Sequence, residues 1–340
     1  MHGPTSPSTR WITTIPGLHG HAVFVDVPTS RVLVCDGWGV SFASLRLRAL
    51  ACDDGHELAS VRLGNAVRAL SVTPDGGLLA ATDTKIFKLD RESLAETERW
   101  TSRIPRYTDE LLVAGDFAHL ATRSRAAVHA ISLRDGATKR KEAGEFARFH
   151  ALDEARFLIA AGAGRLSIAK AGLSGPLESI ATTPPFCDSA LDALGRAWLS
   201  LGAAREQIDE RSVGPGAPTS RLAWLDLAHP SELKETDLGL PFWQLAVSRD
   251  GALLTVIGVT PAPKGPPRRT DVATFLTDDF EQVAWLRMPE GYQVLEVSPE
   301  LGVGWATRQA GDASSELMCF TVGGGGRDPK RSFGQPLKTT

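Results

Sequence analysis

The chain has little of several residue types, and each scarcity excludes a class of protein. Only four of its 340 residues are cysteine and no two form a CxxC pair, so the sequence predicts neither a disulfide framework nor a zinc site. The only asparagine, Asn65, is followed by Ala66 and Val67 and forms no glycosylation sequon. No apolar run is long enough to span a bilayer, and residues 1–11 contain no apolar signal-peptide core. Together these absences predict a cytoplasmic protein with reduced thiols.

An excess of charge of one sign is also absent. The formal net charge is −3, so the chain as a whole is not attracted to nucleic acid or to an anionic membrane. Hydrophobic residues make up 42% of the sequence, which is ordinary for a globular protein and enough for a sizeable core. We therefore expect neither a membrane nor nucleic acid among the partners.

A short phrase that occurs twice is the strongest positive signal. The sequence Arg-Trp-Ile-Thr-Thr-Ile-Pro at Arg10–Pro16 is repeated as Arg-Trp-Thr-Ser-Arg-Ile-Pro at Arg99–Pro105, and Ala284–Pro289 is a looser third copy. The first two tryptophans are about 90 positions apart, or two units of about 45 residues, a period typical of β-propeller blades. Because the first copy stands ahead of any other strand, we predict that it pairs with the last unit.

Short runs with apolar residues at alternate positions, separated by Asp-Gly and Pro turns, predict strands throughout the chain. We expect seven units of four strands, labelled a to d from the centre outward. The clearest unit has its strands at Ala69–Thr73, Leu78–Thr82, Lys85–Asp90 and Glu96–Thr101, with the a–b turn at Pro74–Gly76.

The predicted fold is all-β, a seven-bladed β-propeller of four-stranded antiparallel blades in a single domain from 10 to 322. Three strands are visible in the last unit, which ends at Cys319–Val322, and Arg10–Ile15 supply the fourth. This pairing closes the ring and leaves no open edge between the first and last blades. We expect residues 1–9 to be disordered and residues 323–340, which begin with four glycines and then become basic, to form a flexible tail.

Several phrases carry a resemblance to a known superfamily. The turn Thr73-Pro74-Asp75-Gly76 resembles the Ser-Pro-Asp-Gly turns of WD-repeat and YVTN-type propellers. Trp224-Leu225-Asp226 and Phe87-Lys88-Leu89-Asp90 resemble the end of the third strand of a WD repeat. The resemblance covers about Arg10 to Val322 and implies the seven-bladed propeller fold. Propellers include both enzymes and scaffolds, so the fold alone does not define the function.

Loop lengths indicate which face is functional. In a propeller the b–c and d–a loops share one face, and the a–b and c–d loops share the other. The two longest predicted insertions, Ala203–Pro218 and Val259–Asp271, are b–c loops of neighbouring units. Functional residues concentrate on such loops, although loops also tolerate insertions at little cost in stability. The partner-binding candidates on this b–c/d–a face are Trp38, Arg106, Arg205, Glu206, Arg211, Lys264, Arg268 and Arg269.

Other aromatic residues have a binding and a packing interpretation. Trp11, Trp100 and Trp285 share one strand-d position, and they form either a ring of exposed sites or a repeated contact between blades. We predict the packing role, because repeated aromatics usually belong to the repeated core. We make the same prediction for Phe186 and Phe242, which begin inner strands.

Motifs that carry chemistry are missing. The sequence has no GxSxG elbow, no GxxxxGK[ST] loop and no HExxH helix. His19 and His21 could supply two metal ligands, but catalytic zinc needs three protein ligands. Asp53–Glu57 and Gly162–Gly164 are predicted to be hairpin turns rather than a metal site or a dinucleotide loop. We therefore expect no catalytic residue, no metal and no cofactor.

The leading hypothesis is a non-enzymatic scaffold that presents the b–c/d–a face to a protein partner. The alternative is a cytoplasmic propeller hydrolase of the lactonase type, acting on a sugar lactone. Enzymes of that class are expected to carry Gly-Pro-Arg-His-like phrases at the central channel, and the nearest string here, Gly265-Pro266-Pro267-Arg268, has no histidine after it. A third hypothesis, nucleic-acid binding through Lys264 and the neighbouring arginines, conflicts with the overall charge. The sequence indicates neither the partner's identity nor the oligomeric state.

Overall fold

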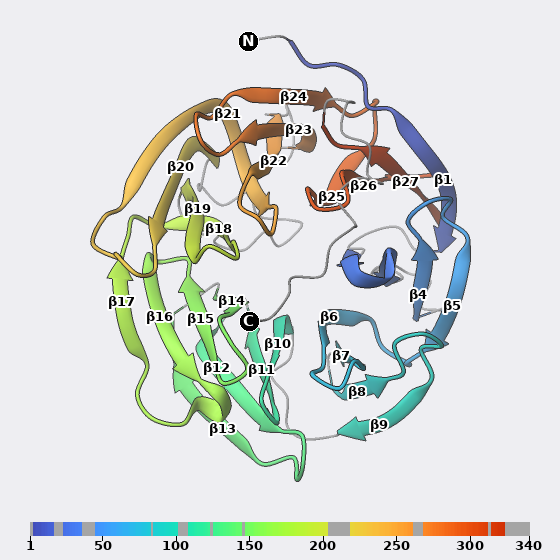
Figure 1. Ribbon diagram of the computed structural model, residues 1–340. Helices are drawn as coiled ribbons and strands as arrows, with labels where there is room; N and C mark the ends of the chain where they lie inside the picture. The colour runs from blue at the N-terminus through green and yellow to red at the C-terminus, as the bar shows by residue number, and fades with distance from the viewer. Residues whose placement is uncertain are drawn as a thin grey trace, which may run out of the picture.

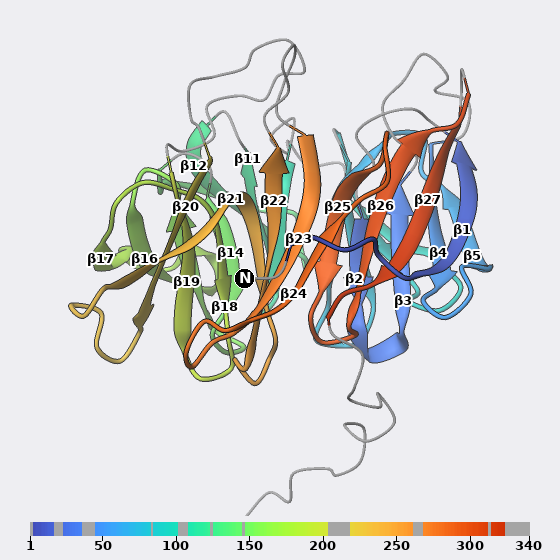
Figure 2. The same ribbon diagram turned by 90° about the horizontal axis from the view of Figure 1, so that it is seen from above.

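The computed structural model describes residues 3–16, 23–35, 45–82, 84–100, 108–122, 125–144, 147–202, 218–260, 268–311 and 314–323. These residues form strands joined by turns, with two single-turn 3-10 segments, η1 (Val27–Thr29) and η2 (Ala171–Leu173). The strands pair into antiparallel sheets arranged around a common centre (Figure 1), and the strands run between two opposite faces of the molecule (Figure 2). No helix in the described part of the chain is long and apolar enough to cross a membrane.

Four sheets follow one another along the first half of the chain, and each contains four consecutive strands. The first sheet contains β2 (Val23–Asp26), β3 (Arg31–Cys35), β4 (Arg46–Ala51) and β5 (Glu57–Arg62). The second contains β6 (Val67–Val72), β7 (Leu78–Thr82), β8 (Ile86–Leu89) and β9 (Glu96–Trp100). The third contains β10 (Thr108–Ala114), β11 (Phe117–Thr122), β12 (Arg125–Ser132) and β13 (Thr138–Glu142). The fourth contains β14 (Arg148–Ala151), β15 (Arg156–Ala161), β16 (Arg165–Lys170) and β17 (Glu178–Thr182).

The fifth sheet has seven strands, so the described residues form six sheets where the sequence predicts seven separate blades. Its 14-residue strand β21 pairs with β20 through its first half and with β22 through its second half. Two predicted units are therefore joined, because β21 is the outer strand of one and continues as the inner strand of the next. The strands are β18 (Phe186–Leu191), β19 (Arg196–Gly202), β20 (Pro218–Asp226), β21 (Lys234–Val247), β22 (Leu253–Thr260), β23 (Arg268–Leu276) and β24 (Gln282–Arg287).

The sixth sheet combines the two ends of the chain. It contains β25 (Gln293–Ser298), β26 (Val303–Gln309), β27 (Ser314–Thr321) and β1 (Thr9–Pro16). β1 runs antiparallel to β27, with Trp11 opposite Cys319 and Pro16 opposite Ser314. Upstream of β1, the Thr5 N–H donates to the Trp285 carbonyl of β24, and the Arg287 N–H donates to the Thr5 carbonyl, both at 2.9 Å. The N-terminal segment therefore contacts both the fifth and the sixth sheets.

The hydrophobic core lies between adjacent sheets and, in the fifth sheet, among its own strands. Trp11 belongs to a cluster shared by the sixth and first sheets, while Trp100 and Trp285 pack against clusters farther along the chain, which confirms that these tryptophans serve the core. Phe186 and Phe242 are also fully buried, as predicted. Residues 53–56 lie in the β4–β5 turn, Glu57 begins β5, and Gly162–Gly164 form the β15–β16 turn.

Gly55, in the β4–β5 turn, is needed for the packing of Trp11. Its φ of +73° is in the left-handed region, and a Cβ atom there would lie 2.5 Å from the Trp11 ring. The Asp-Gly pair at this turn therefore allows β1 to approach the first sheet.

Candidate functional site

Two of the eight predicted binding residues, Arg268 and Arg269, lie in the described part of the chain. The Arg268 side chain is exposed at the start of β23. The Arg269 side chain is directed toward β21, where its Nη1 donates to Gln244 Oε1 at 2.6 Å. The other candidates, like His19 and His21, lie outside the described residues: Trp38, Arg106, Arg205, Glu206, Arg211 and Lys264.

A β-bulge recurs in the innermost strands; in β6 it is followed by the buried Ala69, and in four other strands it is followed by a polar residue. The pairing register shifts immediately before Glu110 in β10, Asp188 in β18, Gln244 in β21 and Glu296 in β25. A bulge re-aims the side chains next to it, and bulges are frequent beside functional sites. Three carboxyl groups and one amide therefore occupy comparable places on four inner strands.

Arg148, the first residue of β14, joins two of these carboxylates. Its guanidinium forms ion pairs with Glu110 of β10 and with Asp188 of β18, the latter at 2.9 Å from Nε to Oδ1. The second Asp188 oxygen accepts the Leu245 N–H at 3.2 Å. The negative charges of Glu110 and Asp188 raise the pKa of Arg148 further above its ordinary value. This three-residue ion-pair cluster connects three sheets at their inner strands.

His150 and Ser189 form a second contact between the fourth and fifth sheets, with His150 Nε2 2.9 Å from Ser189 Oγ. A histidine beside a serine hydroxyl has the geometry of a base with its nucleophile. However, burial and the nearby Arg148 lower the pKa of His150 to about 4, so the imidazole is neutral and weakly basic at neutral pH. We interpret the pair as a structural hydrogen bond between sheets.

A cavity of about 600 Å³ lies where the inner strands β2, β6, β18, β21 and β25 converge. Its wall is mostly apolar and includes Phe24, Leu70 and Leu191. The turns that line it connect β2 to β3, β18 to β19, β21 to β22 and β25 to β26, which are all a–b loops. We call it the axial cavity. It opens on the face opposite the b–c loops that the sequence singles out.

Glu296 is the acidic group that β25 contributes to the axial cavity. Among the described residues, the only hydrogen bond to its carboxyl group comes from the Val297 N–H, at 3.0 Å. Burial raises the pKa of Glu296 to about 7, and the negative charge of Asp188 adds to this, whereas Arg148 and Arg269 oppose it. The side chain is therefore partly neutral and partly ionised at neutral pH.

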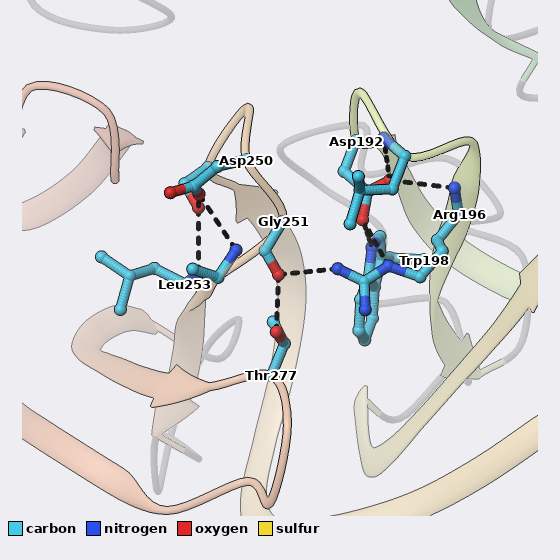
Figure 3. A network of polar contacts seen from close by, with 10 residues as sticks. Asp192, Arg196, Trp198, Asp250, Gly251, Leu253 and Thr277 are labelled. Atoms are coloured by element: carbon cyan, nitrogen blue, oxygen red, sulfur yellow. Dashed lines mark hydrogen bonds and ion pairs between the residues drawn. The ribbon is translucent and has the colours of Figure 1, made fainter.

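A polar network holds one side of the cavity rim (Figure 3). Asp192 accepts from Arg196 Nε at 2.7 Å and from Trp198 Nε1 at 3.1 Å, while Arg196 Nη2 donates to the Gly251 carbonyl at 2.8 Å. Thr277 Oγ1 donates to the same carbonyl at 2.5 Å. These bonds tie the β18–β19 turn to the β21–β22 turn and so fix this side of the rim.

Two large apolar side chains are exposed around this rim. Val72, at the end of β6, lines the cavity and is 43% exposed. Leu194 follows the cavity residue Ala193 in the β18–β19 turn and is 63% exposed. Apolar side chains at the mouth of a preformed apolar cavity are typical of a binding site.

Neither the axial cavity nor the Arg148 ion-pair cluster is among the sites predicted from the sequence. Loop length directs attention to insertions, whereas Glu110, Asp188 and Glu296 lie within strands. A usable signal exists in β25, where Gln293–Ser298 place one acid within an apolar strand. A carboxyl group in an inner strand has to be paired, neutralised or functional.

The described sheets have the arrangement of a β-propeller, and comparison with known proteins agrees. No family model matches the chain, and no curated protein matches it. The WD40 domain of Pan2 from Neurospora crassa matches with a TM-score of 0.64 at 9% identity, over 94% of this chain and 97% of that one. A chain in the mitotic checkpoint complex matches at 0.62 and 13%, over 95% and 98%. A chain of hydrazine synthase from Kuenenia stuttgartiensis matches at 0.60 and 10%, over 95% and 98%.

At these identities the likeness concerns the fold alone. It confirms the resemblance to WD-repeat propellers that the turns and third-strand phrases indicate. The similar chains come from a WD40 domain, a multiprotein complex and an enzyme, so the site has to indicate the function.

Proposed function

We propose that the protein is a non-enzymatic interaction module that binds a protein partner at the axial cavity. The observation that carries this proposal is a preformed apolar cavity with exposed Val72 and Leu194 at its mouth. Interface energy concentrates where an apolar side chain enters such a pocket. The similar chain in the mitotic checkpoint complex belongs to a protein assembly, which supports the same class of function.

The fold-level part of the proposal is a closed ring of seven blades formed by residues 10–322. The seven-stranded sheet then counts as two blades that share β21, and β1 closes the ring by pairing with β27. We also propose a cytoplasmic location, which agrees with four cysteines that form no disulfide bond among the described residues. A ring of this kind is a rigid disc on which loop faces can differ while the core stays the same.

The choice of face follows from the described residues. The axial cavity opens among the a–b loops, so we favour that face for the partner. The opposite b–c/d–a face stays a prediction from the sequence, since six of its eight candidate residues lie outside the described part of the chain.

Affinity capture from a lysate of the native source tests the proposal with paired variants. Val72→Asp places a charge at the cavity mouth, and Val283→Asp is the matched control, because Val283 is a valine of β24 that is 38% exposed. We expect a stoichiometric protein that wild type and Val283→Asp capture and Val72→Asp does not. Its loss in both variants would contradict a specific site.

A third variant tests the other face. Arg268→Glu reverses an exposed charge at the start of β23. A partner lost with Arg268→Glu and retained with Val72→Asp would overturn the choice of face. Absence of any stoichiometric protein partner for wild type would overturn the interaction-module proposal itself.

A further inference from the structure

We propose that the axial cavity recognises a basic side chain of the partner, a lysine or an arginine, whose charged group pairs with Glu296. This inference rests on the proposed function, since it names the chemistry of the partner at the same cavity. The occupant is an extended segment that inserts the aliphatic part of this side chain along the apolar wall. Lysine and arginine combine such a stem with a charged end, which matches a cavity with an apolar wall and an acid.

The hydrogen bonding of the inner carboxylates favours Glu296 as the recognition group. Glu110 and Asp188 are both paired with Arg148, and Asp188 also accepts the Leu245 N–H. Within the described part of the chain, Glu296 accepts only the N–H of the next residue. A carboxylate has about four acceptor positions, so Glu296 retains the capacity to bind an ammonium or guanidinium group.

The two arginines that act on Glu296 already have hydrogen-bond partners, so they do not favour an acidic occupant of the cavity. Arg148 is already paired with two carboxylates, and Arg269 donates to Gln244. An anion in the cavity would lie close to Glu296, a carboxyl group on which the negative charge of Asp188 also acts. A cation there gains from both carboxylates, so the charge pattern is complementary to a base.

The protonation of Glu296 makes the inference measurable. Because burial holds the pKa of this carboxyl at about 7, a cation has to bind its ionised form and release the proton from the neutral form. The ionised fraction rises about tenfold between pH 6 and pH 8 for a group with this pKa, so the affinity for a cation should rise about tenfold.

Several other charged groups either act electrostatically on Glu296 or lie at the cavity rim. Asp188, Arg148 and Arg269 act on it from β18, β14 and β23. At the rim, Asp26 is paired with Arg91, and Glu300 accepts the backbone N–H of Arg249, a further cationic residue of the cavity lining. The pKa of His150, on β14, is about 4, so this group stays neutral from pH 6 to pH 8. The Glu296→Gln variant separates the contribution of Glu296 from all of these.

Three small probes test the chemistry on the full-length protein: 4-phenylbutylamine, 4-phenyl-1-butanol and 4-phenylbutyrate. Titrations followed by NMR give their affinities at pH 6 and pH 8. For wild type at pH 8 we expect the amine to bind about ten times more tightly than the alcohol, and the carboxylate to bind most weakly. The amine should weaken about tenfold at pH 6, and the alcohol should not change.

Glu296→Gln should remove the preference for the amine and its pH dependence while leaving the affinity for the alcohol unchanged. The wild-type pH dependence is a second readout that does not require the variant to fold. Equal affinity for amine and alcohol, a preference for the carboxylate, or no binding of any probe would each overturn the inference. Equal affinities would leave the proposed binding function intact, because an apolar occupant would still fit, and the capture experiment with Val72→Asp tests that function separately.

Discussion

Replacing Trp11 by alanine should destabilise the protein strongly, because this side chain joins the N-terminal strand to the first sheet. Trp11 is only 8% exposed and lies in the apolar cluster formed by β1, β26, β27 and the first sheet. Its indole N–H donates to the Cys52 carbonyl at the end of β4, at 2.9 Å. The ring also covers Gly55, so the substitution leaves a cavity over the β4–β5 turn.

The magnitude follows from two contributions. Removing a buried tryptophan side chain costs about 3–5 kcal/mol, which includes the cavity that it leaves. Loss of the indole N–H leaves the Cys52 carbonyl without its strongest donor, which costs about 1 kcal/mol in a typical buried hydrogen bond. Because the two contributions overlap, we expect a loss of about 4 kcal/mol in the free energy of unfolding. Trp11→Phe retains most of the apolar contact and should lose about 1–2 kcal/mol.

Urea unfolding followed by far-UV circular dichroism measures this loss without relying on tryptophan fluorescence. The neighbouring Ile12→Ala is the control, because Ile12 is on the same strand and is 51% exposed. That substitution should change the free energy of unfolding by less than about 0.5 kcal/mol. If Trp11→Ala unfolds within 1 kcal/mol of Ile12→Ala, β1 contributes little to stability and the proposed closure of the ring is wrong.

Three further predictions concern the ring and its buried charges. Deletion of residues 1–16 exposes the edge of β27 and should lower the unfolding midpoint and promote aggregation, measurable by calorimetry and light scattering. Burial lowers the pKa of His119 to about 4 in the folded protein, whereas its ordinary value in an unfolded chain is about 6.5. Between about pH 6.5 and pH 4, His119 is therefore protonated in the unfolded chain and neutral in the folded protein. Stability should therefore fall as the pH drops from about 6.5 to 4, by up to about 3 kcal/mol from this group, and His119→Gln should show a smaller slope in urea titrations at each pH. Arg148→Met leaves two carboxylates without their cation and should cost about 3–5 kcal/mol of unfolding free energy at pH 7, and less at pH 4, where the carboxyl groups can protonate.

Much of the strand pattern could be predicted from the sequence, because local alternation and turn chemistry determine it. In the second sheet the predicted strand Leu78–Thr82 matches β7, and the Thr-Pro-Asp-Gly turn lies between β6 and β7. The position of the N-terminal strand could also be predicted from the sequence, because its Arg-Trp phrase repeats that of β9. These features depend on residues close together in the chain.

The joining of two units through β21 could not be predicted in the same way. The sequence Gly239-Leu240-Pro241 has the composition of a turn, and Gly239 has a positive φ of 70°. The strand nevertheless continues through it, since residues on both sides pair with neighbouring strands, including Thr219 opposite Phe242. Strand continuity here depends on hydrogen bonds to partners distant in sequence.

Neither the axial cavity nor the Arg148 ion-pair cluster could be predicted, because each depends on several sheets at once. Glu110, Arg148 and Asp188 come from three sheets, and their proximity follows from the order of the inner strands around the centre (Figure 1). β-Bulges then determine which side chains point toward one another, and no local sequence pattern predicts where a bulge lies. The long insertions, in contrast, are visible in the sequence but say nothing about what the inner strands present.

In a fold built from repeated sheets, a residue type that recurs at one strand position indicates packing, and residues that differ at comparable positions are candidates for function. Trp11, Trp100 and Trp285 recur at one strand position: Trp11 and Trp100 pack between sheets, and Trp285 packs within the seven-stranded sheet. The residues after the inner-strand bulges differ: Ala69 of β6 belongs to the core, whereas the four polar residues at the comparable places are not explained by apolar packing. Glu110 of β10 and Asp188 of β18 are paired with Arg148, and Gln244 of β21 accepts a hydrogen bond from Arg269. In the described part of the chain, only β25 presents such a residue, Glu296, to a cavity with just a backbone N–H as its hydrogen-bond partner. This difference among otherwise comparable positions is the physical reason for assigning recognition to Glu296.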